Sequence, residues 1–262
     1  MADLDALLRD FADECAELER IVTLPPADWS KPTPAPGWSI AHQIGHLAWT
    51  DEVATMAAAD ADGFAKLLEQ AAPKAFTFVD EAAEEAATTP SAELLDRWRR
   101  GRDALIEALR AVPHGTKLPW FGPPMSAASM VSARIMETFA HGQDIVDALG
   151  LTRTPTARLR TVAHIGVRTR NFAYSVRGKT APAEEFRVEL TAPDDGVWAW
   201  GPEDAAQRVT GQALDFCLLV TQRRHRDDLA LEAVGADAAE WLTIAQAFAG
   251  PTGAGRAAGQ FD

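Results

Sequence analysis

Two helical segments far apart in the sequence carry metal-binding side chains at a spacing of one helical turn. The first, GWSIAHQIGHLAWTDE, holds His42 and His46, and the second, ARIMETFAHGQDIVDALG, holds Glu137 and His141, with Asp144 three residues later. Residues four apart on a helix project from the same face. If the two helices are neighbours in a bundle, His46, Glu137 and His141 converge on one divalent cation. Three protein ligands with an open position are the arrangement of a catalytic metal.

A structural interpretation of these residues stands beside the functional one. An isolated E-x3-H pattern occurs by chance in many helices, and the conjunction of two such pairs in two apolar helices is what favours a metal site. We expect His42 to be a helix histidine near the cap, with a fourth ligand or a pocket residue as the alternatives. Asp144 is either an acceptor that orients an imidazole from behind or a surface aspartate.

The composition excludes several classes of function. With 25 basic and 38 acidic residues the formal net charge is -13, which disfavours binding to nucleic acid or to anionic lipid. The chain contains no apolar run long enough to span a bilayer, and MADLDALLRDFADE lacks the basic start and apolar core of a signal peptide. We therefore expect a soluble, cytoplasmic protein. A homodimer is left open.

The cysteine usage bears on the chemistry. Cys15 lies on the apolar stripe of the first helix, and Cys217 lies within the apolar run LDFCLLV. Both are expected to be small buried hydrophobes and not nucleophiles or disulfide partners. If thiol chemistry occurs in this protein, the thiol then comes from a small molecule.

The first 150 residues have the apolar periodicity of helices. Ser39 and Ser126 are N-cap candidates, and Gly150 is placed to end a helix. The loop 113–125 either lines a ligand pocket or simply packs its Trp120 and Phe121. Helices are expected over 4–21, 39–60, 91–112 and 126–150, with one or two more within 64–88.

The pattern changes after Gly150. One helix is expected over 151–178, followed by short strands at FRVELTA and VWAW that the turn PDDG separates. A helix at TGQALDFCLLVTQRR, a strand near LALEAVG and a helix at AAEWLTIAQAFAG complete the region. The fold class is thus mainly α plus α/β: a helical bundle over 1–150, a small α/β domain with a leading helix over 151–250, and a disordered tail over 251–262.

This order of elements resembles the DinB-like metal-binding four-helix bundles, and specifically the mycothiol-dependent maleylpyruvate isomerase family. That family places a W-[ST]-x6-H element on the second helix, here Trp38 to His46, and an E-x3-H-x2-D element on the fourth, here Glu137, His141 and Asp144. The resemblance implies that His46, Glu137 and His141 are the metal ligands.

The resemblance continues into the second part of the chain. The stretch VWAWGPEDAAQRVTGQALDFCLLVTQRR looks like the core of the family's small sterol-carrier-related α/β domain, with Trp198, Gly211 and Arg223 in the expected order. Arg223 is the candidate cofactor-binding residue, which would bind a carboxylate across the domain interface. The alternative for Arg223 is a solvated arginine at a helix end.

The resemblance implies an enzyme that uses mycothiol as its thiol cosubstrate, in isomerisation or in thiol transfer to an electrophile. The divalent metal, with zinc favoured, would lower the pKa of the bound thiol. The chain departs from the family in an acidic insertion between the second and third core helices, and no residue matches the isomerase's substrate-binding arginine. The metal site is therefore better supported than maleylpyruvate as the substrate.

Two other functions remain open on the same residues. One is a metal-dependent hydrolase, in which water is the nucleophile. The other is a protein that binds a metal or a small ligand without turnover. Related proteins also carry a wyosine-formation label, but the acidic charge gives no support to a role on tRNA.

Overall fold

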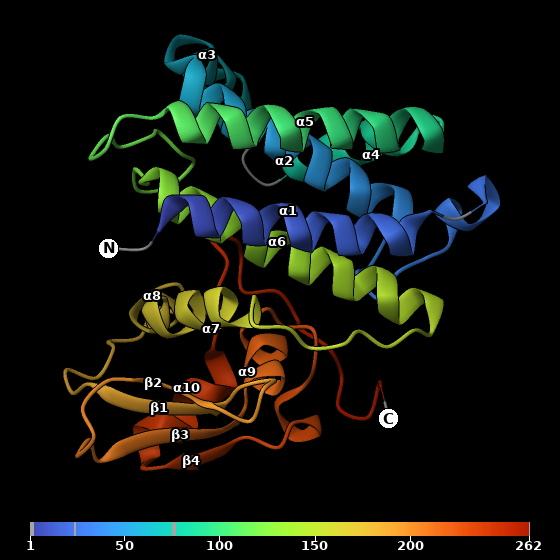
Figure 1. Cartoon of the computed structure of the whole chain (residues 1–262). Helices are drawn as coiled ribbons and strands as arrows, with labels where there is room; N and C mark the ends of the chain where they lie inside the picture. Colours follow the sequence, from blue (N-terminus) through green and yellow to red (C-terminus); the bar gives the residue numbers. More distant parts are fainter. Residues whose placement is uncertain (1–2, 24, 75–76, 262) are drawn as a thin grey trace. The chain divides into compact units, whose positions relative to one another are not determined.

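The structure is a computed structural model that describes residues 3–23, 25–74 and 77–261 (Figure 1). The chain divides into two compact units, with the boundary between Thr152 and Arg153. The first unit is helical, and the second contains a small sheet with helices. In the part of the chain that is described, no helix is both long enough and apolar enough to cross a membrane.

The first unit is built on four long helices, of which α2 packs against α5 and α6, and α1 packs against α6 (Figure 1). Two shorter helices, α3 and α4, pack against α2. All the helices expected in this region are confirmed, and the segment 64–88 holds a pair of helices. The bounds are α1 Leu4–Val22, η1 Pro26–Ser30, α2 Ile40–Ala59, α3 Ala61–Ala71, η2 Ala72–Lys74, α4 Phe78–Ala87, α5 Ser91–Ala111 and α6 Ala127–Leu149.

Local signals set where α6 begins and ends. The Ser126 hydroxyl accepts a hydrogen bond from the backbone N–H of Ser129 at 3.1 Å, which satisfies one of the free donors of the first turn. At the other end Gly150 has a φ of 66°, a left-handed conformation that glycine adopts without steric cost. Both α2 and α6 are buried over most of their surface, which explains why their sequences are apolar on several faces.

The second unit contains a four-stranded mixed sheet in the order β2-β1-β3-β4. The strands β1 and β3 are parallel, and the two outer pairs are antiparallel. The rings of Phe186 on β1 and Phe216 on α9 both pack edge-on against Trp241 of α10, so the helices and the sheet share one core. The bounds are α7 Leu159–Arg168, α8 Arg170–Ser175, β1 Phe186–Thr191, β2 Val197–Trp200, β3 Gln207–Gln212, α9 Ala213–Val220, η3 Arg226–Asp228, β4 Glu232–Val234 and α10 Ala236–Ile244.

Two expectations for this unit are wrong. The single helix over 151–178 is instead α7 and α8, because the chain leaves helical geometry at Thr169, whose hydroxyl donates to the carbonyls of Ile165 and Gln246. The helix expected from Thr210 starts at Ala213, because residues 207–212 form β3. Gly211 suits this strand: a Cβ there would lie 2.7 Å from the Ala230 carbonyl oxygen.

Residues 251–261, the last that the structure describes, carry no helix or strand. The backbone N–H of Gly259 donates to Asp228 Oδ1 at 2.9 Å, and the Arg224 guanidinium lies 4.0 Å from the centre of the Phe261 ring. The disorder expected for the tail 251–262 stays a prediction. The mainly α plus α/β fold class is confirmed by the helical first unit and the mixed sheet of the second.

Candidate metal centre

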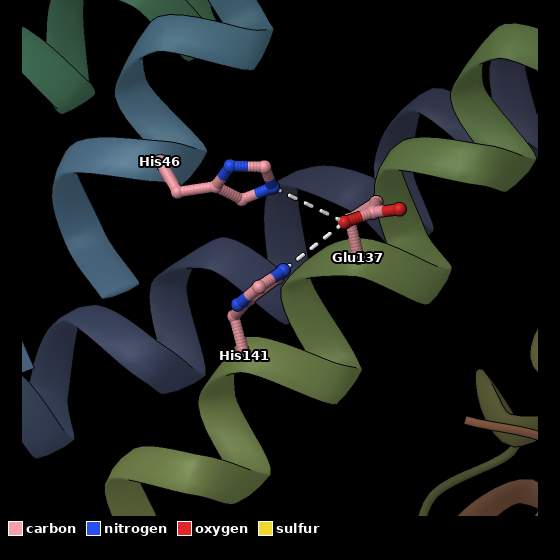
Figure 2. A group of neighbouring side chains, drawn as sticks. All are labelled: His46, Glu137 and His141. Carbon is pink, nitrogen blue, oxygen red and sulfur yellow. Dashed lines mark hydrogen bonds and ion pairs between the residues drawn. The ribbon is translucent and has the colours of Figure 1, made fainter. Parts of the chain in front are cut away.

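Three predicted ligand side chains meet between α2 and α6. Glu137 Oε2 lies 3.4 Å from His46 Nε2 and 3.1 Å from His141 Nε2, so both imidazoles point at one carboxylate oxygen (Figure 2). One ligand atom from each residue lies within 4.8 Å of the other two. Among the described residues this is the one group of three or more histidine, cysteine, aspartate or glutamate side chains able to hold a metal ion.

The electrostatics of the group suit a cation. Burial by itself raises the pKa of Glu137, but hydrogen bonds from His141 and His46, together with their charge, reverse this and hold the pKa well below its ordinary value. Glu137 is therefore an anionic carboxylate. A half-buried carboxylate with two imidazoles is a mixed oxygen and nitrogen donor set of the kind that binds zinc and other first-row divalent metals.

Gln43 orients the His141 ring through Nδ1, the ring nitrogen that does not face Glu137. Gln43 Nε2 donates to Thr33 Oγ1 at 2.9 Å and to Asp144 Oδ2 at 3.4 Å. Because a carboxylate only accepts, these bonds fix the amide so that its Oε1 faces His141 Nδ1, at 2.5 Å. The Nδ1 atom of His141 must then carry a proton, which leaves Nε2 to face the centre.

The same bonds test whether the group fits a metal. The two ring nitrogens of His141 face different partners: Nδ1 faces Gln43 Oε1, and Nε2 faces Glu137 Oε2. With Nδ1 bonded to the amide oxygen, Nε2 is the atom that would bind a divalent cation, and the cation would also balance the Glu137 charge. Among the described residues the buried Nδ1 atom of His46 has no hydrogen-bond partner, and the Nε2 atom faces Glu137, so Nε2 is the atom available to the site. The donor set therefore fits a cation.

The structure decides between the alternatives for Asp144 and His42. Asp144 is fully buried, so the surface alternative is wrong, and its carboxylate reaches His141 through Gln43. His42 Nδ1 accepts from the backbone N–H of Ser39 at 3.2 Å, and its Nε2 lies 2.7 Å from Glu84 Oε2. The expected position of His42 at the cap of α2 is confirmed.

Gln43 is the residue that sequence reasoning missed. It lies one turn before His46 on α2, so the helical spacing places it on the face that carries the ligand. An amide at that position is not a metal ligand by type, and the sequence does not show which side chain of α6 it faces. A search for polar residues three or four positions from each proposed ligand would have given Gln43 as a candidate, but not its partner His141.

We expect Gln43→Leu to weaken metal binding without removing it. The apolar side chain cannot accept the Nδ1 proton of His141, so the imidazole loses its fixed orientation, and losses of about 10- to 100-fold in affinity are typical. Competition of the protein with a zinc-binding dye measures the change. Gln143→Leu is the matched control. Gln143, on α6, is a buried glutamine like Gln43, but its amide donates to Asp147. Equal affinities in the two variants would contradict this role of Gln43.

The two cysteines take no part in the centre. Cys15 and Cys217 form no disulfide and are fully buried, as expected. Burial, followed by the charge of Asp51, raises the pKa of the Cys15 thiol well above its ordinary value, which makes it a poor nucleophile. Any thiol that reacts at this centre therefore comes from outside the chain.

Arg223, the candidate cofactor-binding residue, lies just after α9 in the second unit. Its Nη1 donates to the Thr221 carbonyl oxygen at 2.6 Å. This contact places Arg223 in the turn that follows the helix and not within the helix. Its role in binding a carboxylate stays a prediction.

Two histidines and a glutamate between helices of a bundle, followed by a mixed-sheet unit, define a bundle protein with a candidate metal centre. A family model described as the mycothiol maleylpyruvate isomerase N-terminal domain matches residues 11–146. The chain belongs to the mycothiol maleylpyruvate isomerase family. A second model, described as wyosine base formation, matches residues 182–234 in the second unit.

The chain is also similar to other whole proteins and to solved structures. Uncharacterized proteins from two strains of Mycobacterium tuberculosis are 59% identical to this chain over 257 residues, which is 98% of this chain and 100% of each relative. The crystal structure of the mycothiol-dependent maleylpyruvate isomerase is similar with a TM-score of 0.57 and 16% identity, over 83% of this chain and 88% of that one. A mutant of that isomerase gives the same values. At this identity the likeness to the solved structures is one of fold.

Proposed function

We propose that this protein is a metal-dependent enzyme that uses a small-molecule thiol of the mycothiol type, in isomerisation or in thiol transfer to an electrophile. The observation that carries the proposal is the meeting of His46 and His141 on the Glu137 carboxylate. Family membership supports the choice of thiol, since the solved structure of similar fold is that of a mycothiol-dependent enzyme.

His46, Glu137 and His141 would hold the metal, with zinc favoured because it has no redox chemistry of its own with thiols. A divalent cation there would lower the pKa of a thiol, so that thiolate is available near neutral pH. The side chains around it have separate tasks. Glu137 supplies a balancing negative charge, and Gln43 keeps His141 Nε2 directed at the centre.

The reaction needs no nucleophile from the chain. The external thiol loses its proton to solvent, and its sulfur forms a bond to the electrophilic carbon. In transfer a leaving group departs with the bonding electrons. In isomerisation the sulfur adds to one carbon of a conjugated double bond, whose π electrons move onto the carbonyl; the carbon–carbon bond, now single, rotates, and the returning electrons re-form the double bond and expel the thiolate. The burial of Cys15 and Cys217 supports this use of an external thiol.

The partners proposed for this protein are the thiol and the electrophile. The net charge of -13 argues against nucleic acid and against anionic membrane surfaces. Arg223 is proposed to bind a carboxylate, with an arginine's paired donors as the physical reason. A homodimer is a further proposal, which sedimentation of the purified protein tests.

Zinc-loaded protein is expected to consume mycothiol in the presence of monochlorobimane faster than the uncatalysed reaction does. The fluorescence of the thiol adduct reports the rate, and His141→Ala should reduce the rate to background. Glutathione in place of mycothiol tests the choice of thiol. No acceleration with mycothiol across several electrophiles would count against thiol chemistry, and hydrolysis of an ester or amide by the same protein would favour the hydrolase.

A further inference from the structure

An aromatic cluster adjoins the metal centre. We use this name for five rings that lie within ring-contact distance of one another: Trp49, Phe64, Phe78, Trp120 and Phe121. They come from α2, α3, α4 and the loop between α5 and α6. The cluster therefore joins the acidic α3–α4 segment to the helix that carries His46.

The cluster begins at a metal-site residue. The ring of Trp49 lies 6.3 Å from the ring of His46, one turn earlier on α2. On another side Trp38 is stacked on His141 at 5.8 Å and lies 5.4 Å from His46. Aromatic rings from two segments thus border the histidines. A group bound at the metal centre would have flat apolar surfaces next to it.

The cluster ends at a ring that is open to solvent. Phe64 is fully buried, whereas Phe121 is 44% exposed although it contacts Trp49, Phe78 and Trp120. The exposure does not come from a loose loop, because paired backbone hydrogen bonds between Leu118 and Met125 hold the loop at both ends. An exposed phenyl ring on a fixed loop, in contact with rings that reach a candidate site, is available to contact a bound ligand.

The charges of α4 disfavour an anionic ligand. The sequence of α4, FVDEAAEEAA, has four carboxylates and no base. Two of them contact residues next to the metal centre: Asp80 accepts a hydrogen bond from Trp38 Nε1 at 3.1 Å, and Glu84 Oε2 lies 2.7 Å from His42 Nε2. The Lys74 ammonium, which lies before α4, is already paired with Glu81. Negative charge beside the centre repels a carboxylate-bearing electrophile.

We propose that the electrophile is an uncharged compound with an aromatic or similarly flat apolar group, which packs against Trp49 and Phe121 while its reactive carbon lies at the metal centre. The reaction of this electrophile depends on the proposed thiol chemistry, whereas its binding to the aromatic cluster does not. Stacking and edge contacts with rings supply the affinity. The acidic α4 then selects against dicarboxylates such as maleylpyruvate.

A matched pair of electrophiles tests the proposal on the zinc-loaded full chain. N-benzyl-2-iodoacetamide is neutral and aromatic, and iodoacetate is anionic, yet both react in the same way. The thiol sulfur bonds to the methylene carbon, iodide leaves with the electrons of the carbon–iodine bond, and the thiol proton goes to solvent. We expect the acceleration over the uncatalysed reaction with mycothiol to be about tenfold larger for the benzyl compound.

Phe121→Ala should lower the benzyl acceleration about fivefold and leave that of iodoacetate unchanged. Phe172→Ala is the matched control, since Phe172 on α8 is a phenylalanine of similar exposure, 38%. Equal accelerations for the two electrophiles would overturn the inference while leaving the proposed function in place. A benzyl acceleration that Phe121→Ala does not change would also overturn it.

A binding measurement separates the inference from the proposed function. The neutral probe N-phenyl-1-naphthylamine gains fluorescence in apolar surroundings, and its dissociation constant should rise about fivefold in Phe121→Ala but not in Phe172→Ala. If no electrophile is consumed by any variant, thiol chemistry fails, and this difference in probe binding would still support the aromatic site. Probe binding that is absent, or equal in the two variants, would then overturn the site.

Discussion

His141→Ala is expected to abolish stoichiometric binding of a divalent metal while leaving the helical content nearly unchanged. The variant keeps only His46 and Glu137, and two protein ligands do not hold a metal through desalting. The helices themselves do not depend on the metal, because α2 and α6 already pack through buried apolar side chains such as Ile44 and Ile135. Elemental analysis of metal-loaded, desalted protein and circular dichroism measure the two quantities.

His42→Ala is the control for this experiment. It removes a histidine from the same region, but one whose ring contacts Ser39 and Glu84 and not the Glu137 carboxylate. We expect His42→Ala to retain its metal and to lose about 1 kcal/mol of stability with the cap interaction. Equal metal content in wild type and His141→Ala would mean that His141 is not a ligand, and the proposed site would have to be abandoned.

The helices of the first unit could be predicted because their signals are local. Apolar residues at helical spacing, caps at Ser39 and Ser126 and the glycine at 150 lie within the segments that they control. The pairing of ligands within one helix is local in the same sense. The sequence could not show that the two ligand-bearing helices are neighbours, so the metal site was predicted only on the condition that they are. The contact between α2 and α6 fulfils this condition.

What the sequence did not reveal depends on partners distant in the chain. The strand β3, QRVTGQ, has almost no apolar alternation, because it forms through backbone pairing with β1 and β4. The break at Thr169 depends on a carbonyl of Gln246. Gln43 acquires its role only by facing His141. Each of these requires the tertiary structure to be known first.

A buried ion pair beside the metal centre is another such feature. Arg134 Nε donates to Asp51 Oδ1 at 3.0 Å, and the two side chains are only 3% and 1% exposed. Arg134 Nη2 also donates to the hydroxyl of Thr50, which in turn donates to the backbone carbonyl of His46 at 2.7 Å. Arg134 lies one turn before Glu137 on α6, so the pair links the two helices close to the ligands.

Arg134→Met is expected to lower the free energy of unfolding by about 3–5 kcal/mol, because it leaves the Asp51 carboxylate buried without its counter-ion. The double variant Asp51→Asn, Arg134→Met should recover much of this loss, since no buried charge then remains. Urea denaturation followed by circular dichroism at a helical wavelength measures both. Arg97→Met is the control: its partner Glu52 is 41% exposed, and such pairs contribute about 0–1 kcal/mol.

The destabilisation by Arg134→Met should also depend on pH. Burial raises the pKa of Asp51, and the Arg134 guanidinium partly offsets this effect, so removal of Arg134 raises the pKa further. A carboxyl whose pKa is higher in the folded than in the unfolded state contributes stability at low pH, and this is lost as the pH rises through the folded value. Arg134→Met should therefore lose more stability at about pH 8 than at about pH 5 relative to wild type. The double variant should lack this difference, and its persistence there would assign the pH dependence to groups other than Asp51.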